Sequence, residues 1–225
     1  MVIANPWKAL PRRPPFVVTS DAPYIEAFNQ RFAAKKSHRI DTRLLPEPFV
    51  GRPDAPVLLL ALNPGWSPKD LRWNRRSSFR HRVRSCLSHA AATWPFYHLD
   101  PSEKGPGARW WRRNLGRLVK DSSSEAVAQH VLCVEYFPYH SDEFHHGTLR
   151  LPSQSYTFEL VRSAIHRRAL IVLVRGGDHW LGAVPELERY HRLFRTRNPR
   201  TAAISPRNCP EAYARILRRV RAPDA

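Results

Sequence analysis

The sequence predicts an α/β protein, organised as a three-layer α/β/α sandwich around a central, mostly parallel sheet of four strands. Two observations predict this class: short continuous apolar runs that stop at turn residues, and amphipathic helical patterns between those runs. Because strands and helices alternate, right-handed crossovers would make the strands parallel and cover both faces of the sheet. The 225 residues fit a single domain, 1–225, with an extension and a helix over about 1–50 and an α/β core over about 56–220.

Four apolar segments are expected to form the sheet, and each is closed by a turn signal. The first, Pro56-Val-Leu-Leu-Leu-Ala-Leu62, contains no polar residue, which is typical of a strand buried on both faces. The segment 56–62 is closed by Asn63-Pro64-Gly65, and the segment 130–137 is closed by Pro138. The segment 169–174 is closed by Gly176-Gly177, and the segment 201–204 is closed by Pro206.

Apolar residues at helical spacing predict helices over 108–120, 153–167, 178–193 and 209–220. A further helix is expected from about Asp21, with Ser20 or Asp21 as its cap. The region 67–106 is the least regular, and its arginines are interleaved with Trp73 and Phe79. That pattern is compatible with a basic lid or with a solvated helix.

The charge of the chain indicates a polyanionic partner. There are 37 basic and 19 acidic residues, which gives a net charge of +18. The chain is not globally disordered, because 42% of its residues are hydrophobic and can form a core. Of the basic residues, 31 are arginine, whose guanidinium binds phosphate through two hydrogen bonds and stacks on bases. A codon preference for arginine would explain the same ratio, although it would not explain the shortage of acids.

The spacing of the cysteines and the absence of long apolar runs indicate the cellular compartment of the protein. Cys86, Cys133 and Cys209 are widely spaced and form no C-x-x-C pair, which favours a reducing environment. Residues 1–20 lack the apolar run of a secretory signal, and no stretch is long and apolar enough for a membrane span. We therefore expect a monomer in the cytoplasm, with access to the nucleoid and no membrane partner.

Three short loops resemble the active-site loops of the uracil-DNA glycosylase superfamily. They are Ala61-Leu-Asn-Pro-Gly-Trp66, Glu135-Tyr-Phe-Pro-Tyr139 and Ile204-Ser-Pro-Arg-Asn208, each at the end of an expected strand. The pattern is most similar to the mismatch-specific and single-strand-selective monofunctional branches. It covers about residues 56–220 in order and is specific only at these loops. The resemblance implies an enzyme that binds DNA, extrudes a modified or damaged base and hydrolyses its N-glycosidic bond without a cofactor or a metal.

The resemblance also implies roles for the first two loops. Asn63 would position the attacking water, and Pro64 and Gly65 would shape a turn that presents backbone amides to the target nucleotide. Glu135 and Phe137 would contact the flipped base, Glu135 at the position that reads the edge of the base. A carboxylate only accepts hydrogen bonds, so this residue would favour an edge with N–H donors, such as an amino group, over uracil. A Glu paired with one of the many arginines is an equally good interpretation.

Further candidates lie near these loops. Trp66 is the preferred residue for stacking on the base, ahead of Phe96 and Tyr97, because it follows the turn directly. Asp70 is a reserve carboxylate for activating water, and His140 is a catalytic candidate just past the second expected strand.

The last loop is expected to bind DNA. Ser205, Pro206, Arg207 and Asn208 would lie at a helix start and hold a phosphate or enter the duplex where the base has left. In the resembled branch a histidine stands two residues before the serine, where it stabilises the departing base, but here that position is Ala203. Either Arg207, His140, His179 or another group replaces it, or activity is weak or absent.

Two other functions remain open from the sequence. One is a catalytically silent nucleic-acid-binding module on the same fold, because Ala203 and Glu135 replace expected polar groups. The other is a metal-dependent hydrolase that uses His140, Asp142 and His145. The histidine spacing matches no defined zinc motif, so we expect a solvated loop there and no metal site.

Overall fold

Five strands form one sheet in the order β2-β4-β3-β6-β7, and all neighbours are parallel except β2 with β4. The computed structural model describes residues 3–222. The central strands are the apolar runs of the sequence, and every residue of β3 and β4 is buried. The strands are β2 (Phe49–Val50), β3 (Val57–Ala61), β4 (Val131–Glu135), β6 (Leu170–Leu173) and β7 (Leu193–Arg195).

A second, two-stranded sheet joins the N-terminal part of the chain to the segment after β4. Here β1 (Ile40–Asp41) pairs antiparallel with β5 (His140–Ser141), so that Ile40 lies opposite Ser141 and Asp41 opposite His140. This pairing brings residues of the N-terminal fifty next to a loop that the sequence assigns to the active site.

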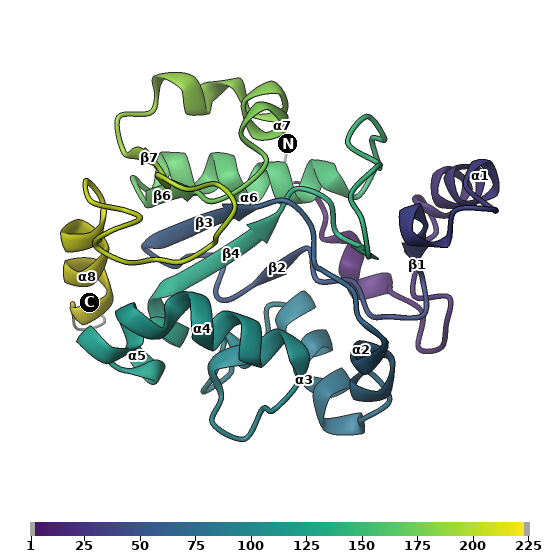
Figure 1. Cartoon of the computed structure of the whole chain (residues 1–225), viewed down its shortest axis with the longest axis horizontal. Coiled ribbons are helices and arrows are strands. Elements are labelled where there is room, and N and C mark those ends of the chain that lie inside the picture. Colours follow the sequence, from purple (N-terminus) through teal and green to yellow (C-terminus); the bar gives the residue numbers. More distant parts are fainter. Residues whose placement is uncertain (1–2, 223–225) are drawn as a thin grey trace.

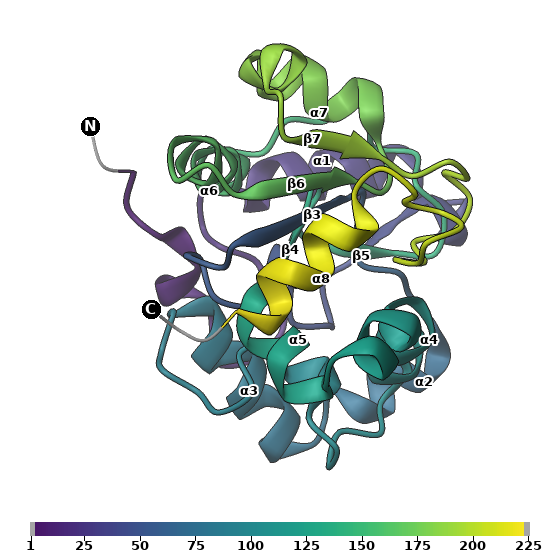
Figure 2. The same ribbon diagram turned by 90° about the vertical axis from the view of Figure 1, so that its left-hand side faces the viewer.

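Helices cover both sides of the large sheet. In Figure 1, α6 (Gln154–His166) and α7 (Gly177–Ala183) lie on one side, and α3 (Ser77–Leu87), α4 (Pro106–Asp121) and α5 (Ser124–His130) lie on the other. Figure 2 shows α8 (Tyr213–Arg221) in front of the sheet, at the end opposite α1 (Ala22–Arg31). The remaining helix is α2 (Pro68–Trp73), and four short 3-10 helices span Pro6–Ala9, Lys36–His38, Tyr97–Leu99 and Pro185–Arg189.

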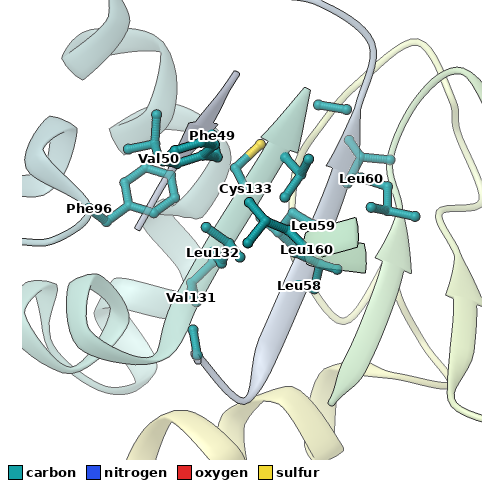
Figure 3. Packing of buried hydrophobic residues seen from close by; sticks show 14 of the residues in the cluster. Phe49, Val50, Leu58, Leu59, Leu60, Phe96, Val131, Leu132, Cys133 and Leu160 are labelled. Carbon is teal, nitrogen blue, oxygen red and sulfur yellow. The ribbon is translucent and has the colours of Figure 1, made fainter. Parts of the chain in front are cut away.

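The core continues from the sheet into the N-terminal segment. Figure 3 shows Leu58, Leu59 and Cys133 of the central strands close to Phe49 of the edge strand and Phe96 below it. Trp7 and Phe16 belong to the same buried cluster. Burial of such large apolar side chains contributes roughly 1.5–3 kcal/mol each, so the segment that contains Trp7 and Phe16 packs as part of the same core.

The expected sheet is confirmed for three strands and wrong for the fourth. Residues 201–204 form no strand; instead the Ile204 N–H donates to the Asn114 carbonyl of α4 at 2.9 Å. Strand β7 takes the edge beside β6, and β2 adds an antiparallel strand on the opposite edge, which makes five strands in place of four.

The helices are confirmed at 106–121, 154–166 and 22–31, whereas the expected helix over 178–193 is wrong in its second half. It ends at Ala183 because Pro185, whose ring is incompatible with a helix interior, follows at once. Asp21 does not cap α1 with its side chain. It is buried and accepts hydrogen bonds from the Tyr139 hydroxyl at 2.8 Å and from the Ser153 N–H at 3.0 Å. Among residues 3–222, no helix is both long and apolar enough to cross a membrane.

A buried histidine should make the stability of this fold depend on pH. His146 is fully buried, with the rings of Phe137 and Phe144 centred 4.0 and 4.4 Å away, and neither of its ring nitrogens has a hydrogen-bond partner among the described residues. Burial lowers the pKa of His146 from 6.5 to about 3, and His145 adds to this effect. His146 therefore binds a proton less readily in the folded protein than in the unfolded chain.

The contribution of His146 to stability should be complete above pH 6.5 and should be lost as the pH falls toward 3, by about 1.4 kcal/mol per pH unit. Denaturant unfolding across this range measures it. The variant His146→Phe should lose this part of the pH dependence, whereas His191→Phe, at an exposed site, should keep it. Equal slopes in His146→Phe and the wild type would contradict the assignment.

Candidate functional site

The carboxyl ends of the parallel strands meet at a cavity of about 460 Å³, within the ~300–1,000 Å³ typical of ligand sites. Parallel register places Ala61 of β3 opposite Glu135 of β4, so the segments that follow the two strands leave the sheet together. Segments from β5, α2 and α4 complete the wall. The lining includes Glu47, Leu62, Asn63, Pro64, Gly65, Trp66, Ser67, Asp70, Trp73, His98, Gly105, Gly107, Trp110, Glu135, His140, Ser141, Asp142, Phe144, Arg175 and Ala202.

Most of the predicted catalytic and base-binding residues lie in this one cavity. They are Asn63, Pro64, Gly65, Trp66, Asp70, Glu135 and His140. Phe137 is the exception: it is fully buried and packs against Tyr139, Phe144 and His146, outside the lining. The sequence prediction that these residues gather at one edge of the sheet therefore agrees with the structure, except for Phe137. Strand β4 ends at Glu135, so the alternation that would place Phe137 on the same side as Glu135 does not continue beyond that residue.

The amide of Asn63 is held so that its oxygen is available. The Nδ2 group donates to the Ser141 Oγ at 2.9 Å and to the Pro64 carbonyl at 3.1 Å. The Oδ1 atom accepts no hydrogen bond from any residue in the described range 3–222. An amide oxygen presented in this way can accept a hydrogen bond from water and orient it, although it is a poor base.

His140 connects two loops through both of its ring nitrogens. Its Nδ1 lies 2.6 Å from the Gly65 carbonyl oxygen, and its Nε2 lies 3.0 Å from the Leu45 carbonyl oxygen. Both ring nitrogens are therefore engaged by backbone carbonyl oxygens. The arrangement fixes the turn after β3 and leaves neither nitrogen for a substrate.

Trp66 and Asp70 flank the entrance to α2. The Asp70 carboxylate accepts a hydrogen bond from the Ser67 hydroxyl at 2.6 Å, across the first turn of that helix. Trp66 is half-buried, and its indole N–H has no partner among residues 3–222. Phe96 and Tyr97, the other aromatic candidates, are core residues outside the lining.

Glu135 is a buried carboxyl group with a free oxygen. Its exposure is 8%, its Oε1 contacts only the Cys133 thiol, at 3.9 Å, and its Oε2 has no partner within the described part of the chain. Burial and the negative charge of Glu47 raise the pKa of Glu135 from 4.5 to about 8, although the Arg175 guanidinium and the Cys133 thiol oppose this shift. Most of this group is therefore protonated at neutral pH.

Glu47 lines the same cavity but is ionised, whereas Glu135 is mostly protonated. Its carboxylate accepts a hydrogen bond from the Tyr97 hydroxyl at 2.7 Å and lies 3.4 Å from the His98 Nε2. Burial alone would raise the pKa of Glu47, but the positive charges of His98 and His140 lower it to about 2. Sequence reasoning missed this residue, because Glu47 lies in a segment that neither an apolar pattern nor the resemblance covers.

Polar atoms without partners gather around the cavity. In the described structure they include the indole nitrogens of Trp66 and Trp73, the Nδ1 of His98, Glu135 Oε2 and the Nε of Arg175. A side chain at Gly105 would collide with the Trp73 indole nitrogen, at 2.6 Å, so the glycine is what admits that ring beside α4. Buried donors and acceptors are normally satisfied, so this set is suited to a polar ligand or to water.

The last predicted loop, Ile204 to Asn208, lies outside the lining, which Ala202 reaches just before it. The expectation that this loop starts a helix is wrong, because residues 205–208 form a turn and α8 begins only at Tyr213. Asn208 is buried, where its amide donates to the Ala203 carbonyl at 2.8 Å and accepts from the Asn198 N–H at 2.9 Å. It therefore shapes the loop. Pro206 and Arg207 are exposed and free to meet a partner.

The residues of the metal alternative do not converge. His145 lies instead with His38 and Glu143: its Nε2 is 2.9 Å from the Glu143 Oε2, and His38 Nε2 is 3.3 Å from the same oxygen. The ligand atoms of these three residues lie within 4.8 Å of one another, and they form the one such group among residues 3–222. The two imidazole rings are stacked 3.5 Å apart, so they would have to move to direct both nitrogens at one ion.

Comparison with known proteins identifies no relative of this chain: no protein-family model, no curated protein and no solved structure matches it.

The proton on Glu135 should be visible in the stability of the protein. The folded pKa of about 8 exceeds the ordinary 4.5, so the stabilising effect is complete below pH 4.5 and is lost as the pH rises toward 8. Relative to Glu135→Gln, which is neutral and of similar size, the wild type should lose about 1.4 kcal/mol of unfolding free energy per pH unit across this range. Denaturant unfolding of both proteins measures the difference, and a constant difference would show that Glu135 is ionised throughout.

Proposed function

We propose that this chain is a monofunctional DNA glycosylase that extrudes a modified or damaged base and hydrolyses its N-glycosidic bond. The observation that carries this proposal is one polar-lined cavity in which Asn63, Trp66 and Glu135 meet at the carboxyl edge of a parallel sheet. The resemblance of three loops to the uracil-DNA glycosylase superfamily supports it. So does the net charge of +18, which suits a polyanionic substrate.

In this proposal each group has a distinct task. Trp66 stacks on the extruded base, while the Oδ1 of Asn63 orients the attacking water. His140 holds the turn that carries both residues, and we assign it positioning in place of proton transfer, since both its nitrogens are occupied. A weak orienting group suffices, because cleavage of this kind has an oxocarbenium-like transition state that depends more on the departing group than on the nucleophile.

The protonation of Glu135 changes the expectation for the base. The preference for an amino-bearing edge assumed a carboxylate that only accepts hydrogen bonds. A neutral carboxyl group both donates and accepts, so an edge with an adjacent acceptor and donor, as in uracil, is equally well matched. A protonated Glu135 therefore accommodates uracil as well as an amino-bearing base.

We also propose the fold family, the cellular location and the DNA contacts of this chain. The helices on the two sides of the sheet would correspond to the three-layer sandwich of the superfamily, with one strand more than the four expected. The protein would act on DNA as a monomer in the cytoplasm, associated with the nucleoid. Arg207 and Pro206 would contact DNA from their exposed loop.

Base release provides the direct test. The wild type should produce alkali-labile abasic sites in single- or double-stranded oligonucleotides that carry uracil, hydroxymethyluracil, modified cytosines, deaminated purines or alkylated bases. Asn63→Ala should reduce the rate on the responsive base by about 10²-fold or more, because the water loses its orientation. Ser141→Ala, which frees the amide but keeps its oxygen, should cause a smaller loss.

Thermal unfolding must show that both variants remain folded. Unchanged turnover in Asn63→Ala would refute its assigned role. Tight, salt-sensitive binding without base release from any oligonucleotide would favour the silent nucleic-acid-binding module.

The salt dependence of DNA binding tests the loop at 205–208. Removing one phosphate contact lowers the slope of log K against log salt by about one, so Arg207→Ala should weaken binding and flatten the slope by this amount. Arg189→Ala, on the 3-10 helix after α7, is the matched control and should leave the slope unchanged. An identical slope in Arg207→Ala would remove this loop from the interface.

A further inference from the structure

We propose that Glu135 is the general acid of the reaction, giving its proton to the base as the base departs. This inference rests on the proposed glycosylase function and assigns a second role to the residue that contacts the base. The groups that line the cavity and the need to protonate the departing base support it.

Breaking the bond between C1′ and the base nitrogen leaves the electron pair on the base. In a cavity with buried walls an anionic base is poorly solvated, so a positioned proton donor lowers the barrier. General acid catalysis of this type contributes about 10²–10⁴-fold to the rate. The cavity should therefore contain a group that is neutral, protonated and not committed to another partner.

The other ionisable groups of the lining do not meet this description. Both ring nitrogens of His140 are engaged by backbone carbonyls, and the Nε2 of His98 lies 3.4 Å from the Glu47 carboxylate. The Asp70 carboxyl group is engaged by the Ser67 hydroxyl, and Asp142 is exposed to solvent. Arg175 can stabilise negative charge but cannot release a proton.

The other residues considered for this task are also unsuitable. His179 packs on the ring of Tyr136, 5.0 Å away, and lies outside the lining, as does the exposed Arg207. Ala203 uses only its backbone, whose carbonyl accepts from Asn208.

Glu135 meets each requirement. It is 8% exposed, it lines the same cavity as Asn63, and its Oε2 has no partner among the described residues. The charged or titratable groups that face it are Glu47, Arg175 and Cys133, and burial together with the fixed charge of Glu47 keeps its pKa near 8. A pair of carboxyl groups whose environments separate their proton affinities is a common arrangement for acid catalysis.

The proton balance of the step is complete without a cofactor. The C1′–N bond breaks and its electron pair remains on the base, which takes the proton of Glu135. Water oriented by Asn63 forms the new C1′–O bond and loses one proton to solvent. Glu135 recovers a proton from solvent, so one water molecule is consumed.

The test compares two leaving groups in oligonucleotides. One carries the base that the wild type releases, and the other carries its fluorinated analogue, which departs more easily without protonation. Glu135→Gln should reduce release of the first by about 10²-fold or more and release of the second by less than about tenfold. The single-turnover rate of the wild type should fall tenfold per pH unit above about 8, and Glu135→Gln should lack this decline.

Two control variants separate the possible failures. Glu186→Gln, at an exposed pair with Arg162, should match the wild type, and Asn63→Ala should lose activity on both substrates alike. Equal losses on the two substrates in Glu135→Gln, or a wild-type rate that stays constant through pH 8, would overturn the general acid and leave the glycosylase intact. No release of any base by the wild type would overturn both.

Discussion

The parallel pairing of β3 with β4 on one side and β6 on the other determines where the polar groups of this protein lie. Parallel strands end at the same edge, so the segments after Ala61, Glu135 and Leu173 must leave the core together. The short β1–β5 pairing then draws the N-terminal part of the chain to that edge. The cavity is a consequence of these two hydrogen-bonded arrangements.

A second constraint acts within the cavity, where two buried carboxyl groups cannot both be ionised at low cost. Glu47 is beside the imidazoles of His98 and His140 and takes the negative charge, whereas Glu135 has only Arg175 in opposition and keeps its proton. This separation of charge gives the site one neutral acid and one fixed anion.

The sequence predicted much of the sheet and part of the site. The central strands were predictable because a strand buried on both faces is a continuous apolar run, and Asn63 and Glu135 follow from their place at strand ends. Strand β2 has two residues and carries no periodicity, and β7 is half-exposed, so neither had a signal. The proton on Glu135 was beyond prediction, because it depends on burial and on the charge of Glu47, which only the folded chain brings into the same cavity.

The central claim is that Glu135 is a neutral acid in the resting protein. Carbon-13 NMR of the glutamate side-chain carboxyl groups, with the signal of Glu135 assigned by its loss in Glu135→Gln, measures this directly. The account predicts that the signal titrates near pH 8 and that Glu47→Gln shifts the titration to lower pH, because a repelling charge is removed. A titration near the ordinary value of 4.5 would contradict the account.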